Sequence, residues 1–347
     1  MTADLIAWVM VLAIAAYACA GGTDYGAGFW DLLAGGAERG DRPRRLIDHA
    51  MAPVWEVNNV WLIFVLVIMW TGFPAMFQAV FSAMWLPLAL AAVGLVLRGA
   101  GFALRKPSHR LAQRRVYGAV FAISSLVTPF FLGAVLGGIA AGRVKVGEPA
   151  SADAWANPTS VLTGLLAIAA AAFLGAVFLC SDALRFGAGD LVGYFRVRAL
   201  LAFAAIVVLA IVALPVTHDH ARYVWDGLTG GLGLLLIALA ALCGLATVGL
   251  LWRRSYGWSR HTSVASVALV VGAWGFAMRP YALPTSLTVA DAAGAEHTLR
   301  WLLIVTLIAI VLVGPALVVL WRLDTMGRLE GLTDSDTGAA RVPGDNL

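Results

Sequence analysis

Nine long apolar segments dominate this sequence and restrict the folds that it can adopt. Each has about the length of the roughly 20-residue helix that crosses the hydrocarbon core of a bilayer. No stretch between them has the pattern of a soluble domain. The sequence therefore predicts an all-α polytopic membrane protein with nine transmembrane helices. The segments lie at residues 5–22, 55–73, 76–98, 116–141, 159–183, 199–216, 227–251, 262–283 and 301–321.

The low charge content supports this class. Only 13% of the residues are charged and 61% are hydrophobic, whereas soluble domains carry about 25% charged residues. The 24 Lys and Arg residues exceed the 20 Asp and Glu residues, but in a membrane protein such an excess reflects topology. No nucleic-acid partner is therefore expected. Because no basic residue precedes the first apolar segment, we interpret it as a spanning helix and not as a cleaved signal.

Residues 1–322 are expected to form one transmembrane domain. Residues 323–347 are rich in Gly, Asp and Thr, and this composition is typical of a disordered tail. Between the second and third segments only Gly72, Phe73 and Pro74 interrupt the apolar pattern. This short break predicts a tight helical hairpin.

The basic residues predict the orientation of the chain. With nine helices, one set of alternate loops holds 18 Lys and Arg residues and the other holds five. Cytoplasmic loops carry the excess of basic residues in membrane proteins. The N-terminus is therefore predicted outside and the C-terminus in the cytoplasm. The five external basic residues are Arg143, Lys145, Arg222, Arg279 and Arg300.

The histidine positions argue against a haem held by this chain within the bilayer. A b-type haem in a membrane needs His, or His with Met, projecting from helices. All six histidines lie in predicted loops or at predicted helix ends. The segment from His218 to His220 could bind a surface metal, but no further ligands flank it. We interpret it as a solvated external loop and predict no metal site. The histidines are His49, His109, His218, His220, His261 and His297.

Five charged residues are predicted near the cytoplasmic ends of helices. Acidic groups within a bilayer are costly and usually functional. Asp24 and Asp31 follow the first segment, Glu56 lies just inside the second, Arg98 ends the third and Asp182 ends the fifth. These residues are the candidates for buried polar chemistry.

Glu56 is the most informative of them. A carboxylate near a helix start can simply be favoured by the helix dipole, but Asn58 and Asn59 have no propensity reason to lie in an apolar helix. The pattern suits a proton relay or a structural hydrogen-bond knot, and the sequence does not separate the two. The candidates for a proton path are Glu56, Asn58, Asn59 and Asp24. Direct pairing of Glu56 with Arg98 is disfavoured because their depths differ by about 12 Å.

Four segments resemble a known family. GGTDYGAGFWD at residues 21–31 resembles the stretch after the first helix of subunit II of cytochrome bd-type quinol oxidases. PVWEVNNVWLI at residues 53–63 is similar to the family's Pro-x-Trp-acid-x-Asn-x-Val-Trp-Leu signature and is the most specific. RGAGFALR at residues 98–105 and PTSLT at residues 284–288 resemble two further family stretches. The motif residues with expected structural roles are Trp55, Trp61, Arg98, Gly99, Phe102 and Arg105.

The resemblance implies a haem-free subunit of a respiratory terminal oxidase in the bacterial cytoplasmic membrane. That oxidase couples quinol oxidation to the reduction of oxygen to water, and its haems b and d belong to the larger subunit I. No cofactor is therefore expected on this chain alone, and subunit I is its expected obligate partner. Subunit II is implied to stabilise that assembly and to supply part of a proton path from the cytoplasm. A structural quinone or lipid occupies the subunit in some relatives. By the same analogy, the nine helices form two four-helix bundles plus one peripheral helix.

One departure from the family pattern bears on the proton path. Ala103 stands where the third motif has an acid, which in some members lies on the proposed proton route. Any path in this chain must begin or continue differently, or rely on Glu56 and water. Two other functions stay open. One is a purely structural scaffold subunit. The other is a secondary transporter, for which the breaks at Pro129 and Pro315 are typical, although Pro is common in membrane helices.

Overall fold

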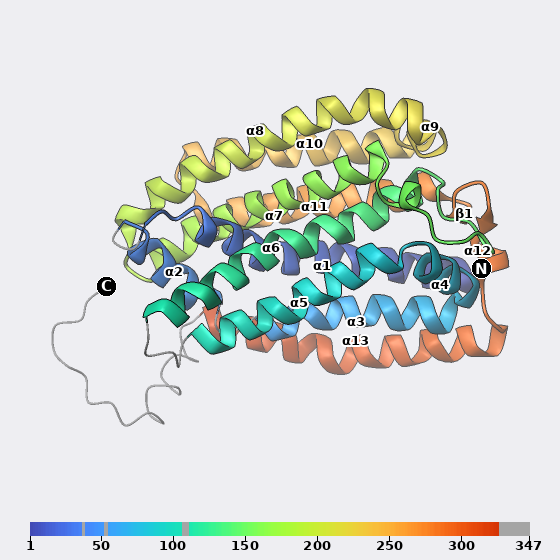
Figure 1. Cartoon of the computed structure of the whole chain (residues 1–347), viewed down its shortest axis with the longest axis horizontal. Coiled ribbons are helices and arrows are strands. Elements are labelled where there is room, and N and C mark those ends of the chain that lie inside the picture. Colours follow the sequence, from blue (N-terminus) through green and yellow to red (C-terminus); the bar gives the residue numbers. More distant parts are fainter. Residues whose placement is uncertain (37–38, 52–54, 106–110, 326–347) are drawn as a thin grey trace.

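The computed structural model describes residues 1–36, 39–51, 55–105 and 111–325; the side chains of a few helical residues, Glu56 among them, lie outside this description. The described chain is almost entirely helical (Figure 1). Its elements are α1 (Thr2–Leu32), α2 (Asp41–Met51), α3 (Trp55–Gly72), α4 (Pro74–Ala83), α5 (Trp85–Arg105), α6 (Leu111–Ala140), η1 (Ala152–Ala154), α7 (Pro158–Arg185), α8 (Gly189–His220), α9 (Arg222–Thr229), α10 (Gly231–Trp252), α11 (Tyr256–Met278), β1 (Tyr281–Leu283), β2 (Leu287–Thr288), α12 (Val289–Ala292) and α13 (Glu296–Thr325).

The long helices have the dimensions of membrane spans. Within the described ranges, eight are long and apolar enough to cross a membrane, and the α3–α4 pair makes nine when it is counted as one span. That pair bends by 118° at the break between Gly72 and Pro74. The predicted class, an all-α polytopic membrane protein, is confirmed. The exact nine-span arrangement stays a prediction.

Helix α1 lies at the centre of the molecule (Figure 1). It contacts α3, α6, α7 and α11. Neighbours in sequence also pair, as α5 with α6, α7 with α8 and α10 with α11. Helix α7 also contacts both α6 and α1, so these pairs form one continuous body, with α13 at its edge against α3 and α1. The division into two four-helix bundles plus one peripheral helix stays a prediction.

The two ends of the helical body differ. Helices α1 and α5 finish near α2 at one end, which we call the α2 end (Figure 1). The antiparallel hairpin of β1 and β2 lies at the other, which we call the hairpin end. The amphipathic helix α2 was not predicted; it buries Pro43, Leu46, Ile47 and Met51.

The predicted end of the first helix was wrong. Helix α1 continues ten residues beyond residue 22, so Asp24 and Asp31 lie within it and not after it. The reason is packing, because glycines in this stretch bring neighbouring helices very close. A Cβ at Gly26 would lie 1.9 Å from the Ala171 carbonyl oxygen of α7. Tight helix contact of this kind is common in membranes and outweighs the low helix propensity of glycine.

Other predicted boundaries also moved. The third predicted segment, residues 76–98, is split at Met84 into α4 and α5, and α5 continues to Arg105. Arg98 is therefore inside a helix and not at its end. The seventh segment is likewise interrupted, at Gly230, between α9 and α10, and the eighth ends at Met278 before the hairpin.

Candidate functional site

A buried carboxylate and amide join α1 to α3. Asp24 of α1 is 7% exposed and Asn58 of α3 is 8% exposed. The Asn58 side-chain nitrogen donates to Asp24 Oδ2 across 2.5 Å and to the backbone oxygen of Ala20 across 3.3 Å. Two residues named from the sequence as proton-path candidates are thus in direct contact. A buried carboxylate with few donors can accept further hydrogen bonds.

Arg98 of α5 lies in the same interior region and is 3% exposed. Its Nε donates to Ser125 Oγ of α6 across 3.2 Å. Its guanidinium carbon lies 4.8 Å from the ring centre of Tyr25 and 5.2 Å from that of Phe121, distances at which a cation is attracted to an aromatic face. Tyr25 is the residue after Asp24 on α1, so this contact brings Arg98 into the neighbourhood of the carboxylate. Its Nη2 is buried and has no hydrogen-bond partner among the described residues.

Two tyrosines extend this polar region along α1. The hydroxyls of Tyr17 and Tyr25 lie 2.7 Å apart and share a hydrogen bond. Apolar side chains surround them, including the predicted motif residue Trp61, which is partly buried against the same cluster. The carboxylate, amide, guanidinium and phenol groups are therefore enclosed by hydrocarbon. We call Asp24, Asn58, Arg98, Tyr25 and Ser125 the central polar cluster.

The other residues named from the sequence have different positions. The side chains of Glu56 and Trp55 lie outside the described residues, although both belong to α3. Asn59 and Gly99 are half-buried. The Phe102 ring packs 5.7 Å from that of Phe121. Because the Glu56 side chain is not described, pairing between Arg98 and Glu56 stays untested. The described partners of Arg98 are Ser125, Tyr25 and Phe121.

Among the motif residues, Arg105 forms an ion pair between two helices. Its Nη1 lies 3.0 Å from Asp31 Oδ2, and the Asp31 side chain is 3% exposed. Arg105 therefore ties the last turn of α5 to the last turn of α1 at the α2 end. Asp182 is ion-paired as well, with Arg260 of α11.

The histidines with described side chains are all exposed: His49, His218, His220, His261 and His297. His109 lies outside the described residues. His218 Nδ1 contacts Asp219 Oδ1 across 2.6 Å. Among the residues that the structure describes, no three His, Cys, Asp or Glu side chains are grouped so that they could hold a metal ion.

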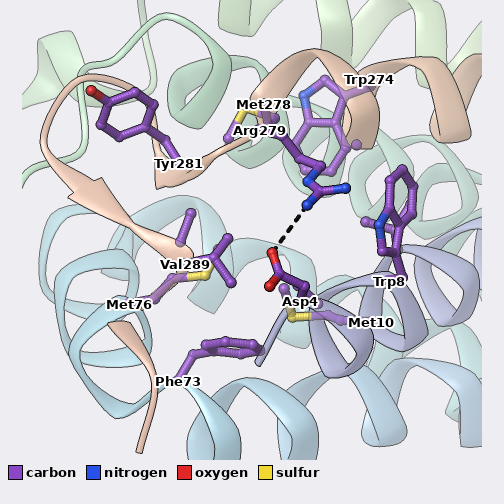
Figure 2. A pocket seen from close by; sticks show the side chains of 14 residues that line it. Asp4, Trp8, Met10, Phe73, Met76, Trp274, Met278, Arg279, Tyr281 and Val289 are labelled. Carbon is purple, nitrogen blue, oxygen red and sulfur yellow. Dashed lines mark hydrogen bonds and ion pairs between the residues drawn. The ribbon is translucent and has the colours of Figure 1, made fainter. Parts of the chain in front are cut away.

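A separate cavity of about 50 Å³ opens at the hairpin end (Figure 2). Its lining is mainly apolar, with Trp8, Phe73 and Trp274 among the side chains that surround it. At its edge, Arg279 Nη2 lies 3.1 Å from Asp4 Oδ1. This chemistry suits a hydrocarbon group, and it offers no route for protons comparable to the central polar cluster.

Several members of the site were missed by sequence reasoning. Ser125, Tyr17 and Tyr25 were not named, and Arg98 was placed at a helix end. Asp24 and Tyr25 follow Tyr17 by seven and eight residues, which is about two helical turns. In a helix, this spacing predicts that all three side chains share one face. This signal required knowing that the glycine-rich stretch is helical.

Three comparisons with known proteins agree with one another. The family model for cytochrome bd terminal oxidase subunit II matches residues 2–324. Cytochrome bd ubiquinol oxidase subunit 2 of Bacillus subtilis (strain 168) is 24% identical, over 80% of this chain and 82% of its own. Cytochrome bd-I ubiquinol oxidase subunit 2 of Escherichia coli (strain K12) is also 24% identical, over 88% and 89%. A chain in the structure of bd oxidase from Geobacillus thermodenitrificans superposes with a TM-score of 0.73 at 27% identity, covering 93% of this chain and 98% of that one.

Proposed function

The chain belongs to the cytochrome bd terminal oxidase subunit II family, and from that premise we propose that it carries protons from the cytoplasm towards the site of oxygen reduction in its complex. It is a multi-pass membrane subunit of a quinol oxidase, so it takes part in an enzyme. The reduction of oxygen to water consumes protons, and a bilayer does not conduct them. The proposal gives this subunit part of that supply.

The central polar cluster is the observation that carries the proposal. Asp24 is a carboxylate enclosed by helices and hydrogen-bonded to Asn58, and Arg98 contacts the ring of the adjacent Tyr25. Charged groups inside a membrane protein are expensive and are usually retained for function. A carboxylate can take up and release a proton, whereas the amide and guanidinium position it.

The alternative is a purely structural scaffold subunit. In that case the same contacts join α1, α3, α5 and α6 and hold no mobile proton. The contacts themselves suit both functions. The two functions differ in whether Asp24 must exchange a proton during turnover.

Substitution of Asp24 in the two-subunit oxidase separates the two. Asp24→Asn keeps the size and most hydrogen bonds but does not titrate near neutral pH. With normal haem spectra, we expect oxygen reduction to slow by roughly tenfold or more, as for loss of a positioned proton-transfer group. Asp24→Glu should retain much of the activity. Asp153→Asn, at an exposed acid of η1 that pairs with Arg143, is the control and should have no effect. Parental turnover in Asp24→Asn would refute the proton role.

The remaining functions proposed for the subunit concern its complex. We propose that it stabilises subunit I, that the haems b and d of the complex reside there, and that quinol and oxygen react there. The many exposed apolar side chains on α8, α10 and α13 require lipid or another subunit around them. We also propose that the N-terminus lies outside, as the distribution of basic residues predicts; the α2 end, and so the last turns of α1 and α5, would then face the cytoplasm.

A bound quinone or lipid is a further proposal. The apolar cavity at the hairpin end suits the end of a hydrocarbon chain, with Arg279 at its edge (Figure 2). Extraction and mass spectrometry of lipids from the purified complex test this. The parent is compared with an Ala7→Leu variant, in which a larger side chain replaces a small one that lines the cavity. Equal lipid and quinone content in both would exclude the cavity as the site.

A further inference from the structure

A second polar group lies at the α2 end, where α1, α2 and α5 meet. Asp31 of α1 contacts Arg105 of α5 twice, at 3.0 Å and 3.5 Å. Arg44 of α2 reaches the same carboxylate, with its Nε 3.3 Å from Oδ1. Asp31 is therefore a buried carboxylate held by two guanidinium groups from two other helices.

Asp48 of α2 connects this group to solvent. Its Oδ1 lies 3.4 Å from Arg105 Nη1, the same nitrogen that contacts Asp31. The Asp48 side chain is 27% exposed, against 3% for Asp31. One guanidinium nitrogen thus lies between a carboxylate that faces water and a carboxylate that does not. Arg105 is therefore the common partner of both carboxylates, and it holds them at the same end of the helical body.

Asp31 and Arg105 lie along the same helices as two residues of the central polar cluster. Asp24 and Asp31 are seven residues apart on α1, and Arg98 and Arg105 are seven residues apart on α5. Residues with this spacing share a helix face and are separated by about 10 Å along the axis. Each carboxylate of α1 therefore has an arginine of α5 at a corresponding level.

A serine hydroxyl lies between the two levels. Gly28 is on α1 between Asp24 and Asp31, and a Cβ there would lie 2.1 Å from Ser125 Oγ. The absence of a side chain at Gly28 thus leaves room for this hydroxyl. Ser125 accepts from Arg98 and donates to the Phe121 backbone oxygen across 2.7 Å. Polar groups therefore continue along α1 from Asp31 towards Asp24.

We propose that Asp48 and Asp31 collect protons at the α2 end and deliver them to Asp24, with Arg105 and Arg44 as positioning residues. A proton leaves a hydronium ion or water and forms an O–H bond on the Asp48 carboxylate. It then passes to Asp31 and, through intervening water, to Asp24. Each donor carboxylate returns to its ionised form, and no electrons move. This inference rests on the proposed proton-carrying function and names where that route begins in a chain that has Ala103, and no acid, on the last turn of α5.

The test uses the two-subunit oxidase and measures quinol-driven oxygen consumption against pH. Asp48→Asn and Asp31→Asn remove the two proton acceptors. For Asp48→Asn we expect normal haem spectra and turnover reduced by about tenfold at alkaline pH. This loss is smaller than is usual for a positioned acid, because Asp31 remains as a proton acceptor. The defect should shrink at acid pH, where protons are abundant. Asp190→Asn is the control, since Asp190 is an exposed acid of the same end that pairs with Arg42.

Rescue separates proton collection from a mere anchoring role for α2. Ala103 is exposed and lies two residues before Arg105 on α5. Ala103→Asp supplies an exposed carboxylate at this end on α5 and leaves the residues of α2 unchanged. In the Asp48→Asn background it should restore most of the turnover. A defect that is independent of pH and not rescued would mean that Asp48 only anchors α2, and would overturn the inference.

The outcome at Asp24 keeps this inference distinct from the proposed function. If Asp24→Asn slows turnover while Asp31→Asn and Asp48→Asn assemble and run at the parental rate at every pH, protons reach Asp24 from elsewhere and the inference is wrong. If Asp24→Asn itself turns over normally, the proposed function fails and this inference fails with it. If the Asp31→Asn oxidase does not assemble, the Asp48→Asn variant and its rescue by Ala103→Asp still test the inference.

Discussion

The Asn58 side-chain amide donates a 2.5 Å hydrogen bond to the Asp24 carboxylate, and this contact joins α3 to α1 inside the helical body. Both side chains are more than nine-tenths buried. Because the Asn58 nitrogen also donates to the Ala20 backbone oxygen, its amide is fixed in orientation. The contact therefore sets both the rotation of α3 against α1 and the position of the carboxylate.

Replacing Asn58 should lower stability, and exchanging the pair should restore part of it. Asn58→Leu leaves a buried carboxylate without its donor, at a cost of about 1–3 kcal/mol. We expect the thermal midpoint of the complex to fall by several degrees. The exchanged variant, Asp24→Asn with Asn58→Asp, keeps one amide and one carboxylate in contact and should recover part of that loss. Recovery is incomplete because a carboxylate at position 58 cannot donate to the Ala20 backbone oxygen. Equal midpoints for Asn58→Leu and the parent would show that the bond contributes nothing to stability.

Glu56 gives a second test of proton transfer. Glu56 belongs to the first turn of α3 and precedes Asn58 by two residues. If Glu56 relays protons, Glu56→Gln should slow oxygen reduction by roughly tenfold or more, while Glu56→Asp keeps much of the rate and both keep the haems. A normal rate in Glu56→Gln would exclude the relay. Loss of haem in both variants would instead favour the scaffold function.

Much of the helical arrangement was predictable from the sequence, because runs of about 20 apolar residues have few other folds available in a membrane. Helix ends were less predictable. Residues 21–28 contain four glycines and read as a loop, and only the close approach of α7 to Gly26 explains why they are helical. Helix α2 did leave a signal, since Pro43, Leu46, Ile47 and Met51 recur at helical spacing.

The candidate site was partly predictable for a similar reason. Asn58 was identifiable because amides in apolar helices are unusual, and Asp24 because acidic groups near the membrane are costly and usually functional. Their contact with each other, and the proximity of Arg98 and Ser125, depend on the relative rotation and tilt of four helices. These quantities are set by packing of small residues across helix interfaces and are not encoded in any one segment.

Cysteine labelling should report the orientation. The predicted topology places the hairpin end outside and the α2 end in the cytoplasm. An impermeant thiol reagent added to intact cells should label Ser151→Cys, which is exposed between η1 and the end of α6, but not His49→Cys on α2. After permeabilisation both should react. The native cysteines, two buried and one half-buried, provide the background. Labelling of both sites from outside would contradict the topology.

Single substitution of each histidine should leave the haem content of the complex unchanged. The five histidines with described side chains are exposed, and axial haem ligands within a membrane project from helices into the protein. Pyridine haemochrome spectra of the purified variants measure this directly. Loss of one haem in any variant that still assembles would place an axial ligand on this chain.

The contact of α1 with α7 should be highly sensitive to a single methyl group. A Cβ at Gly26 would lie 1.9 Å from the Ala171 backbone oxygen and 2.9 Å from the Gly175 Cα, and these backbone atoms cannot move aside as a flexible side chain can. Gly26→Ala must therefore push the two helices apart. Overpacking of this kind costs about 1–3 kcal/mol, which exceeds the gain of about 1 kcal/mol in helix propensity.

The matched control is Gly193→Ala in α8, where a Cβ would meet nothing within 4 Å. We expect Gly26→Ala to lower the thermal midpoint and the yield of assembled oxidase, and Gly193→Ala to leave both unchanged or slightly raised. Because Asp24 lies on the same stretch of α1, turnover per assembled complex should fall as well. If Gly26→Ala assembled and turned over like Gly193→Ala, the close approach of α1 and α7 would not be needed to hold the central polar cluster in place.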